Sequence, residues 1–419
     1  MVISKGLDTD TARSLRTLRE LACQYREAAA ADRNAERLKL HKASNDLHMI
    51  RPVVLIDELP WHEMDMDGEL TCVCTDPVLR DAEWYLRTSL YKFRHMPADM
   101  VLRPYLPVLK VGHSTGIGIS VEEKTLSTDV HNNVVSHEYV DQLSTEEDLL
   151  KLHEPVITYD EEETLARYGK LGEAVGDILP VRIIGYDGLY TATWDDIASY
   201  RGVTNLLMDL AERPDFMHKI VSRLTDITVS ILEQYEKLGL FENDSLLVHC
   251  TPASTDDLPK PPDGVCRREH IWGRGMAQIF ASVSGAMRAE FDIAYMKKTI
   301  GQCGLAYYGC CEPLDKCMDV VAQLPNLRKV GVTPWADVDV ATESINTRFV
   351  AAVKPNPALV GVPKLDADTV KAEMRRILSA CKRNGCSCDI VLKDISTCCG
   401  RPENIFEWER LVMDMVMDY

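Results

Sequence analysis

The sequence lacks several features that would place it in a familiar class. No apolar run reaches the roughly 18 residues that a membrane-spanning helix needs. The opening residues, MVISKGLDTDTARSL, have no apolar core, so we expect no signal peptide and no membrane segment. Neither a GxGxxG turn after a strand nor a GxxxxGK[ST] loop is present, which removes the best support for a nucleotide-binding open sheet.

Positive charge is also scarce in this chain. Its 419 residues include 47 Lys and Arg against 65 Asp and Glu, a formal net charge of −18. A chain this acidic is a poor binder of nucleic acid or of an anionic membrane surface, so we expect neither partner. Hydrophobic residues make up 46% and charged residues 27%, typical of a globular protein.

Cysteine is the residue type in excess, with 14 copies. Without a signal peptide, these thiols predict a reducing, cytoplasmic location and not a disulfide scaffold. Most are expected to be small buried hydrophobes. Thiols that are not part of the core are candidates for metal ligation or redox chemistry.

The apolar pattern changes along the chain. Helical spacing is expected over 8–48 and 76–96, where Asp76 can cap and Pro77 can open the second helix. Short apolar runs then alternate with helical patterns at 200–239, 286–300 and 366–380; the runs are 100–111, 178–185, 245–250, 305–310, 327–332, 349–354 and 389–395. With an eighth strand hidden in 112–140, this predicts an α/β fold, a TIM (β/α)8 barrel over 99–419 preceded by a helical extension over 1–98.

Three of these runs end in thiols. His249-Cys250, Cys310-Cys311 and Cys398-Cys399 each follow an expected strand, where the active sites of such barrels lie. Adjacent thiols cannot easily chelate one ion together, so one of each pair is expected to be structural. We therefore name Cys310 and Cys311 as the first candidate metal ligands and Cys398 and Cys399 as the reserve, with His249 and Cys250 as ligands or substrate contacts.

Glu290 is the carboxylate that we add to this ligand set. Ser284 can cap a helix over 286–300, on which Met287, Phe291 and Ala294 place Glu290 on the apolar side. A buried carboxylate needs a partner, and a metal shared with a thiolate would supply one, as would an Arg or Lys. The alternative is a surface glutamate whose carboxylate reaches the solvent. Mixed sulfur, oxygen and nitrogen ligation with an open position is typical of catalytic zinc.

Aromatic and imidazole side chains near loops complete the candidate list. Trp61 and Trp272 could contact a planar aromatic or cationic substrate, although packing is their commoner role. His62 and Tyr308 are included as substrate contacts for the same reason, and His62 could instead be a satisfied polar group. The sequence names no substrate.

Several stretches together resemble the uroporphyrinogen decarboxylase-like superfamily, in its branch of cobalamin-dependent methyltransferases. They span nearly the whole chain and are Asn45-Asp46, Arg51-Pro52, Ile56-Asp57-Glu58-Leu59-Pro60-Trp61, Trp272 to Gln278, Val283-Ser284, Tyr308-Gly309-Cys310-Cys311-Glu312-Pro313-Leu314 and Leu392-Lys393-Asp394-Ile395. The resemblance implies a TIM barrel that binds zinc near its mouth and moves a methyl group between a small substrate and the cobalamin of a corrinoid protein partner. A homodimer is compatible with it.

The motif departs from the family at several ligand positions. Where related coenzyme M methyltransferases have His-x-Cys, this chain has Tyr308-Gly309-Cys310, so only Cys310 carries over. The O-demethylase spacing between a Glu and a His matches Glu290 and Cys311, while Gly275 stands in the place of a further Glu. Cys398 or Cys399 could supply the missing ligand.

The substrate expected from this resemblance is a methyl ether, a methylamine or a thiol compound. Two other classes stay open: a metal-free decarboxylase like the superfamily's namesake, and a non-catalytic barrel that binds a small ligand. The net charge of −18 and the lack of an Arg cluster in the sequence speak against a polycarboxylate substrate.

Overall fold

A seven-stranded parallel sheet forms the centre of the molecule, a computed structural model that describes residues 9–127 and 135–419. In spatial order its strands are β1 (Val53–Ile56), β15 (Ser387–Leu392), β14 (Val350–Val353), β13 (Leu327–Val332), β12 (Leu305–Tyr308), β11 (Trp272–Gly275) and β8 (Gly188–Thr191). Most of these residues are buried, which explains their near-continuous apolar runs. The α/β class is therefore confirmed.

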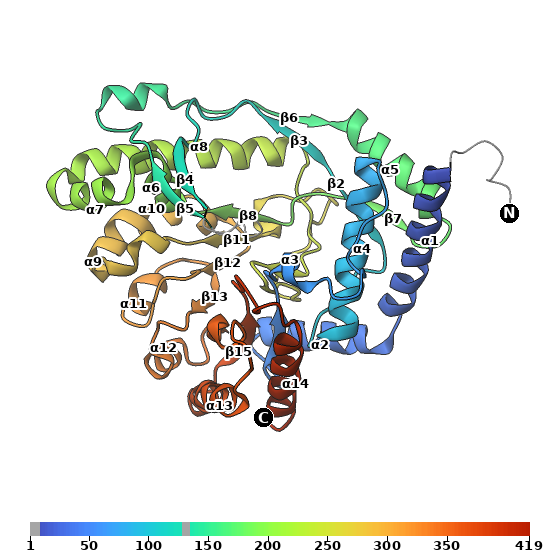
Figure 1. Cartoon of the computed structure of the whole chain (residues 1–419). Coiled ribbons are helices and arrows are strands. Elements are labelled where there is room, and N and C mark those ends of the chain that lie inside the picture. The colour runs from blue at the N-terminus through green and yellow to red at the C-terminus, as the bar shows by residue number, and fades with distance from the viewer. Residues whose placement is uncertain (1–8, 128–134) are drawn as a thin grey trace.

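Helices cover the outer face of this sheet, as Figure 1 shows. They are α9 (Gly285–Arg288), the π-helical segment η4 (Ala289–Ile293), α10 (Ala294–Met296), α11 (Met318–Val321), α12 (Val338–Ile345), α13 (Ala367–Asn384) and α14 (Glu403–Met417). They share one apolar core with the strands. The helix expected over 286–300 exists, but it is broken into three short segments of different winding.

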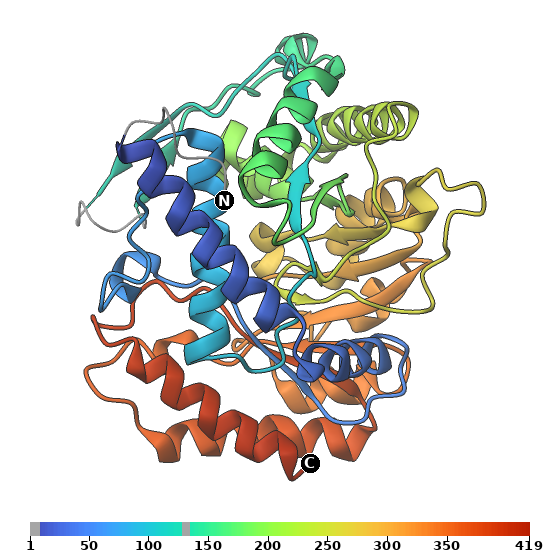
Figure 2. The same ribbon diagram turned by 90° about the vertical axis from the view of Figure 1, so that its right-hand side faces the viewer.

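The N-terminal helices divide between two cores. α2 (Asp32–Asn45) contacts β1 and β15, and Met64 of α3 (Trp61–Met64) belongs to the core of the central sheet. α1 (Thr9–Ala29) and α4 (Pro77–His95) lie side by side and form a second core (Figures 1 and 2). α5 (Glu161–Val175) joins their core. The Asp76 carboxylate caps α4 by accepting from the Leu79 N–H at 3.1 Å, as predicted. The region before residue 98 also contributes β1 to the central sheet.

Shorter strand pairs stand outside the sheet. β2 (Leu106–Leu109) and β7 (Val181–Ile184) are parallel; β3 (Val111–Ser114) with β6 (Ile157–Asp160), β4 (Glu123–Leu126) with β5 (Ser136–Tyr139), and β9 (Leu247–Val248) with β10 (Thr251–Pro252) are antiparallel. The eighth parallel strand expected within 112–140 is not among the described residues of that range, because β3, β4 and β5 pair antiparallel; residues 128–134 lie outside the description. The run 245–250 forms only β9, since the chain turns back at His249.

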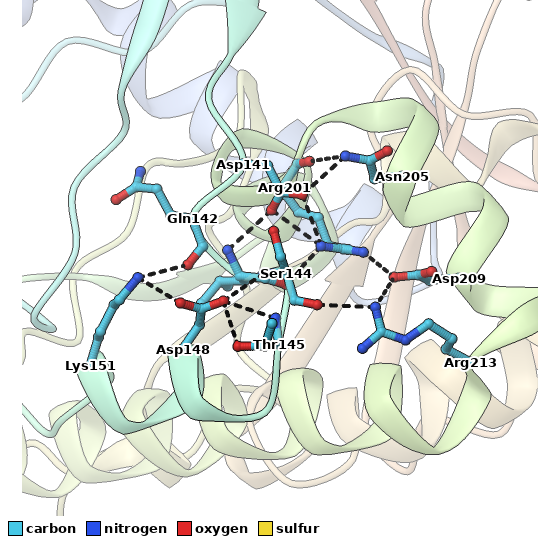
Figure 3. Close-up of polar contacts among 11 residues, drawn as sticks. Asp141, Gln142, Ser144, Thr145, Asp148, Lys151, Arg201, Asn205, Asp209 and Arg213 are labelled. Atoms are coloured by element: carbon cyan, nitrogen blue, oxygen red, sulfur yellow. Dashed lines mark hydrogen bonds and ion pairs between the residues drawn. The ribbon is translucent and has the colours of Figure 1, made fainter.

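A helical layer over 193–237 carries a dense polar network. α6 (Thr193–Arg201), α7 (Val203–Glu212) and α8 (Pro214–Lys237) pack together, which confirms the helices expected over 200–239. In Figure 3, Arg201 donates to Asp141 at 3.1 Å and to Asp209, beside the 3-10 turn η1 (Glu147–Lys151). The remaining short turns are η2 (Arg268–His270), η3 (Gln278–Ser282), η5 (Ile300–Gln302) and η6 (Pro357–Leu359).

All fourteen thiols are free in this structure. Within the described part of the chain, no helix combines the length and the apolar character that crossing a membrane requires.

Candidate functional site

Charged and thiol side chains gather at the carboxyl end of the parallel sheet. Because the strands are parallel, their carboxyl ends share one edge, which is where open and closed α/β sheets bind ligands. We call this group the strand-end cluster, and it consists of Glu58, His249, Cys250, Arg274, Cys310, Cys311, Lys354, Lys393 and Asp394. It draws on the ends of β1, β11, β12, β14 and β15 and on the β9–β10 turn.

The β9–β10 turn holds two of these residues in an uncommon backbone conformation. His249 has φ +44° and Cys250 has φ +63°. Two consecutive positive φ values at the tip of a two-residue hairpin normally require Asn and Gly. Glu58 (φ +48°) and Asp394 (φ +57°) are also left-handed, so the cluster contains four of the eight non-glycine residues with positive φ in the described chain. Such strain concentrates at functional sites.

His249 and Cys310 form the centre of the cluster. His249 Nε2 lies 3.3 Å from Cys310 Sγ and 3.0 Å from Lys393 Nζ. Cys250 Sγ lies 3.3 Å from a Glu58 oxygen. Glu58, His249 and Cys250 place one ligand atom each within 4.8 Å of one another, the one such trio of His, Cys and carboxylate groups among the described residues.

Cys310 is poised to be a thiolate. A hydrogen bond from the Cys311 thiol, 3.5 Å away, lowers its pKa most, and Lys354, Lys393 and Arg274 lower it further. These effects outweigh burial and bring the pKa of Cys310 to about 6. The same contact raises the pKa of Cys311 far above its ordinary value, so Cys311 stays protonated. One thiol therefore donates and the other accepts.

The imidazole of His249 is held neutral. Burial lowers its pKa most, and the positive charges of Arg274, Lys393 and Lys354 lower it further. A neutral imidazole accepts from the Lys393 ammonium through Nε2. Burial alone would lower the pKa of Lys393, but Cys310, Asp394 and Glu58 raise it above its ordinary value, so this lysine is charged.

Backbone contacts fix the position of Cys310. Gly309 has φ +111°, and a Cβ there would approach Leu314 Cδ1 to 2.8 Å, so only glycine suits this turn. The buried Glu312 carboxylate accepts from the Cys310 N–H at 3.0 Å and from the Ala277 N–H at 3.1 Å. The buried Lys354 ammonium donates to the Cys310 carbonyl. The thiolate is thus carried on a tightly held loop.

Two pockets adjoin the cluster. A small one of about 180 Å³ is lined by Cys310, Cys311, Lys354, Lys393 and Asp394, with Trp335 at its rim. Trp335 is 70% exposed, which is unusual for tryptophan. A larger one of about 430 Å³ lies between the cluster and α4, and Cys250 and Trp61 line it.

Four of the predicted site residues meet in this cluster: His249, Cys250, Cys310 and Cys311. The other predicted ligands lie elsewhere. Cys398 contacts Glu63 at 3.2 Å, and the exposed Cys399 contacts the Gly361 carbonyl at 3.3 Å.

Glu290 differs from its expected environment. We expected it on the apolar side of a regular helix, and that expectation is wrong: its side chain is 58% exposed and pairs with His218 at 3.0 Å. Its neighbours Phe291, Asp292 and Ile293 are buried instead. The π-helical winding of η4 explains the change, because an extra residue per turn shifts which side chains face the core.

The predicted substrate contacts are divided between surface and core. Trp61 lines the larger pocket, and His62 lies 3.5 Å from Glu63. Trp272 is buried and donates from Nε1 to the Ala253 carbonyl at 2.9 Å. Tyr308 is fully buried; it accepts from Arg288 at 2.8 Å and donates to Asp292, so it belongs to a packed network behind the sheet.

Sequence reasoning assigned no role to five members of the cluster: Glu58, Arg274, Lys354, Lys393 and Asp394. A usable signal was present for four of them, because each follows an apolar strand, whereas Arg274 lies within β11. Glu58 lies two residues after β1, Lys354 follows β14, and Lys393-Asp394 follows β15. A charged residue directly after a buried parallel strand points to the ligand-binding edge of the sheet.

Comparison with models of protein families and with curated protein sequences gave no match to this chain.

Proposed function

We propose that this protein is a methyltransferase that moves a methyl group from a small methylated substrate, of the methyl ether or methylamine type, to the cobalamin of a corrinoid protein. The observation that carries the proposal is the Cys310 thiolate held 3.3 Å from the neutral imidazole of His249 at the carboxyl end of the sheet. The type of reaction is inferred from the sequence stretches that contain Glu58, Cys310 and Lys393, which resemble those of cobalamin-dependent methyltransferases.

The donor set fits a zinc ion. His249 Nε2 and the Cys310 thiolate are two electron-pair donors 3.3 Å apart. Nε2 accepts from Lys393 in this structure, so zinc binding would displace that hydrogen bond and leave the ammonium paired with Asp394. Two such ligands of one tetrahedral zinc would stand roughly 3.5 Å apart, close to the separation seen here. His249, Cys250 and Glu58 would hold the ion, with Cys310 joining beside His249. When bound, zinc supplies Lewis-acid polarisation of the heteroatom that carries the methyl group.

The residues of the chain prepare this site in three ways. Cys311 donates to Cys310 and keeps it ionised at neutral pH. Lys393 binds Glu58 and Asp394, both at 3.1 Å, and so joins the segment after β1 to the end of β15. Glu312 accepts from the Cys310 N–H and so holds the loop after β12 that carries the thiolate.

We also propose a closed barrel architecture and a cytoplasmic location for this protein. We infer that the parallel sheet is the larger part of a (β/α)8 barrel whose wall is completed near β2 and β7. Its mouth would then be the docking site of the corrinoid protein. Fourteen free thiols are consistent with a reducing cytoplasm.

Zinc content and methyl transfer test this function. The purified protein should hold about one zinc per chain, and Cys310→Ser should lose it, because a hydroxyl is a poor zinc ligand. Cys398→Ser is the matched control, because Cys398 is a buried thiol in the loop after β15 that contacts Glu63, and this variant should retain the metal. Absorbance should report methylation of cob(I)alamin with a methoxy or methylamine substrate. A protein without zinc that methylates cob(I)alamin with neither class would refute the proposal.

One observation favours a second candidate, the metal-free decarboxylase. Although the sequence shows no Arg cluster, Arg274, Lys354 and Lys393 converge on Cys310 in space and could bind substrate carboxylates. Loss of uroporphyrinogen, followed by absorbance after oxidation of the porphyrinogens, distinguishes this activity from methyl transfer.

A further inference from the structure

Three arginines are buried in the described part of the chain, and two of them have carboxylate partners. Arg201 binds Asp141 and Asp209 (Figure 3), and Arg288 lies 3.8 Å from Asp292. Arg274 is 7% exposed, yet no carboxylate of the described residues lies within ion-pair distance of it. Since an unpaired buried charge is costly, the exception calls for a physical explanation.

The surroundings of Arg274 satisfy it poorly. Its guanidinium lies over the Tyr190 ring, with Cζ 4.4 Å from the centroid, and Nη2 lies 3.2 Å from Met276 Sδ, a weak acceptor. Its Nε has no hydrogen-bond partner. Strand register places Arg274 directly beside Tyr190 on β8 and Tyr307 on β12, so the three side chains share one face of the sheet.

Tyr307 adds a second unsatisfied group on that face. It is fully buried, and its hydroxyl has no hydrogen-bond partner. Its ring stacks with His249, the ring centroids being 6.1 Å apart, so the hydroxyl-bearing side chain adjoins the centre of the strand-end cluster. Arg274 Nε and the Tyr307 hydroxyl thus both lack an acceptor, and N–H and O–H groups of this kind are the donors that bind a carboxylate.

The Cys310 thiolate does not neutralise Arg274 by itself. The Cys311 thiol contacts that sulfur at 3.5 Å, and the Lys393 ammonium lies 4.0 Å from it. Asp394 and Glu58 are bound by Lys393, and Glu312 is bound by two backbone N–H groups. The positive charge of Arg274 therefore remains available to an incoming anion.

We propose that Arg274, with the Tyr307 hydroxyl, binds a carboxylate of the substrate, so that the methylated molecule is a small carboxylic acid. The identification of the bound molecule as a methylated substrate rests on the proposed function, whereas the carboxylate-binding site does not. The planar guanidinium fork suits the two oxygens of a carboxylate. The carboxylate would lie on the Arg274 side of His249 and would leave the Cys310 side to the methyl-bearing atom.

Thermal unfolding with acetate as the probe tests the site without zinc, cobalamin or turnover. At constant ionic strength, acetate in place of chloride should raise the melting temperature of the wild-type protein, and sulfate should raise it less. Arg274→Met should abolish this response and raise the melting temperature in chloride by about 2 °C, because it removes an unpaired buried charge. Arg376→Met, at an exposed arginine, should leave both values unchanged.

Tyr307→Phe provides a variant that keeps the packing of the ring. It should weaken the acetate response several-fold while the melting temperature in chloride stays the same. An acetate response retained in Arg274→Met, or no response in the wild-type protein, would overturn the proposal. The acetate response could be lost in Arg274→Met while the wild-type protein fails to methylate cob(I)alamin. That result would support the carboxylate site and refute the methyltransferase function.

Discussion

Two polar regions of this molecule treat buried charge in opposite ways. Around Arg201, Asp141 and Asp209 balance the guanidinium (Figure 3). The Leu143 carbonyl adds an acceptor at 2.8 Å. At the strand-end cluster, a thiolate and several ammonium groups crowd together, Arg274 lacks a counterion, and four residues adopt left-handed backbone.

The contrast separates two purposes of buried polarity. The balanced network around Arg201 offsets the desolvation of its charges and joins Asp141 and Leu143 to α6 and α7, so it stabilises the fold. An unbalanced cluster leaves donors and electron pairs unmet, and a ligand can meet them. The two regions should therefore respond differently to substitution.

The largest loss of stability is expected from Arg201→Met. It leaves Asp209 buried beside no counterion except the partly exposed Arg213, and it unties Asp141 from α6. Breaking a buried pair in this way should lower the free energy of unfolding by about 3–5 kcal/mol, measured by urea denaturation. The surface variant Arg376→Met should lose only about 0–1 kcal/mol. A smaller loss in Arg201→Met than in Arg376→Met would contradict the stabilising role of the Arg201 network.

A smaller and pH-dependent loss is expected from Glu63→Gln. Burial alone would raise the pKa of Glu63, but hydrogen bonds from Thr397, Gly400 and Cys398 outweigh it and lower the pKa to about 2. The ionised carboxylate therefore stabilises the fold fully above its ordinary pKa near 4.5, and this contribution is lost as the pH falls through about 2.

At pH 7 the Glu63→Gln variant should be about 1–2 kcal/mol less stable than the wild type. The gap between the two proteins should narrow as the pH falls from about 4.5 toward 2. Urea denaturation of both proteins across this range checks the sign, and a gap that widens in acid would contradict it.

The smallest effect has the opposite sign. The Glu58 side chain is 40% exposed and its φ is +48°, so Glu58→Gly should relieve backbone strain and raise the free energy of unfolding by about 1 kcal/mol. The same change removes a carboxylate of the proposed zinc site and should weaken zinc binding, measured by competition with a chelating dye. Asn346→Gly, at φ +41° outside the cluster, should stabilise without affecting zinc. Equal zinc affinity in the Glu58 variant and the wild type would remove Glu58 from the site.

Local signals in the sequence predicted much of the fold. The run 327–332 is β13 with the expected bounds, because a buried parallel strand leaves a continuous apolar stretch. The cap at Asp76 also follows from local chemistry. The convergence of His249 with Cys310 was anticipated only as a shared sheet edge, since their contact spans 61 positions in sequence.

The failures have physical causes. Glu290 was placed by a 3.6-residue period that the π-helical η4 does not follow. The turn at His249 has no glycine or asparagine to announce it, so 245–250 was interpreted as a strand. The missing counterion of Arg274 is a property of its neighbours in space, and no local pattern reports it.

The pairing of β1 with β15 has a consequence for how the protein is made. The register that joins Ile56 to Leu392 brings Glu58 against Lys393, although the two are far apart in the sequence. A ribosome must release the chain through Lys393 before this edge can close, so helices α1 and α4 can pack before the strand-end cluster forms. A product terminated before β15 would carry Cys310 without Lys393 and Asp394, which complete its surroundings.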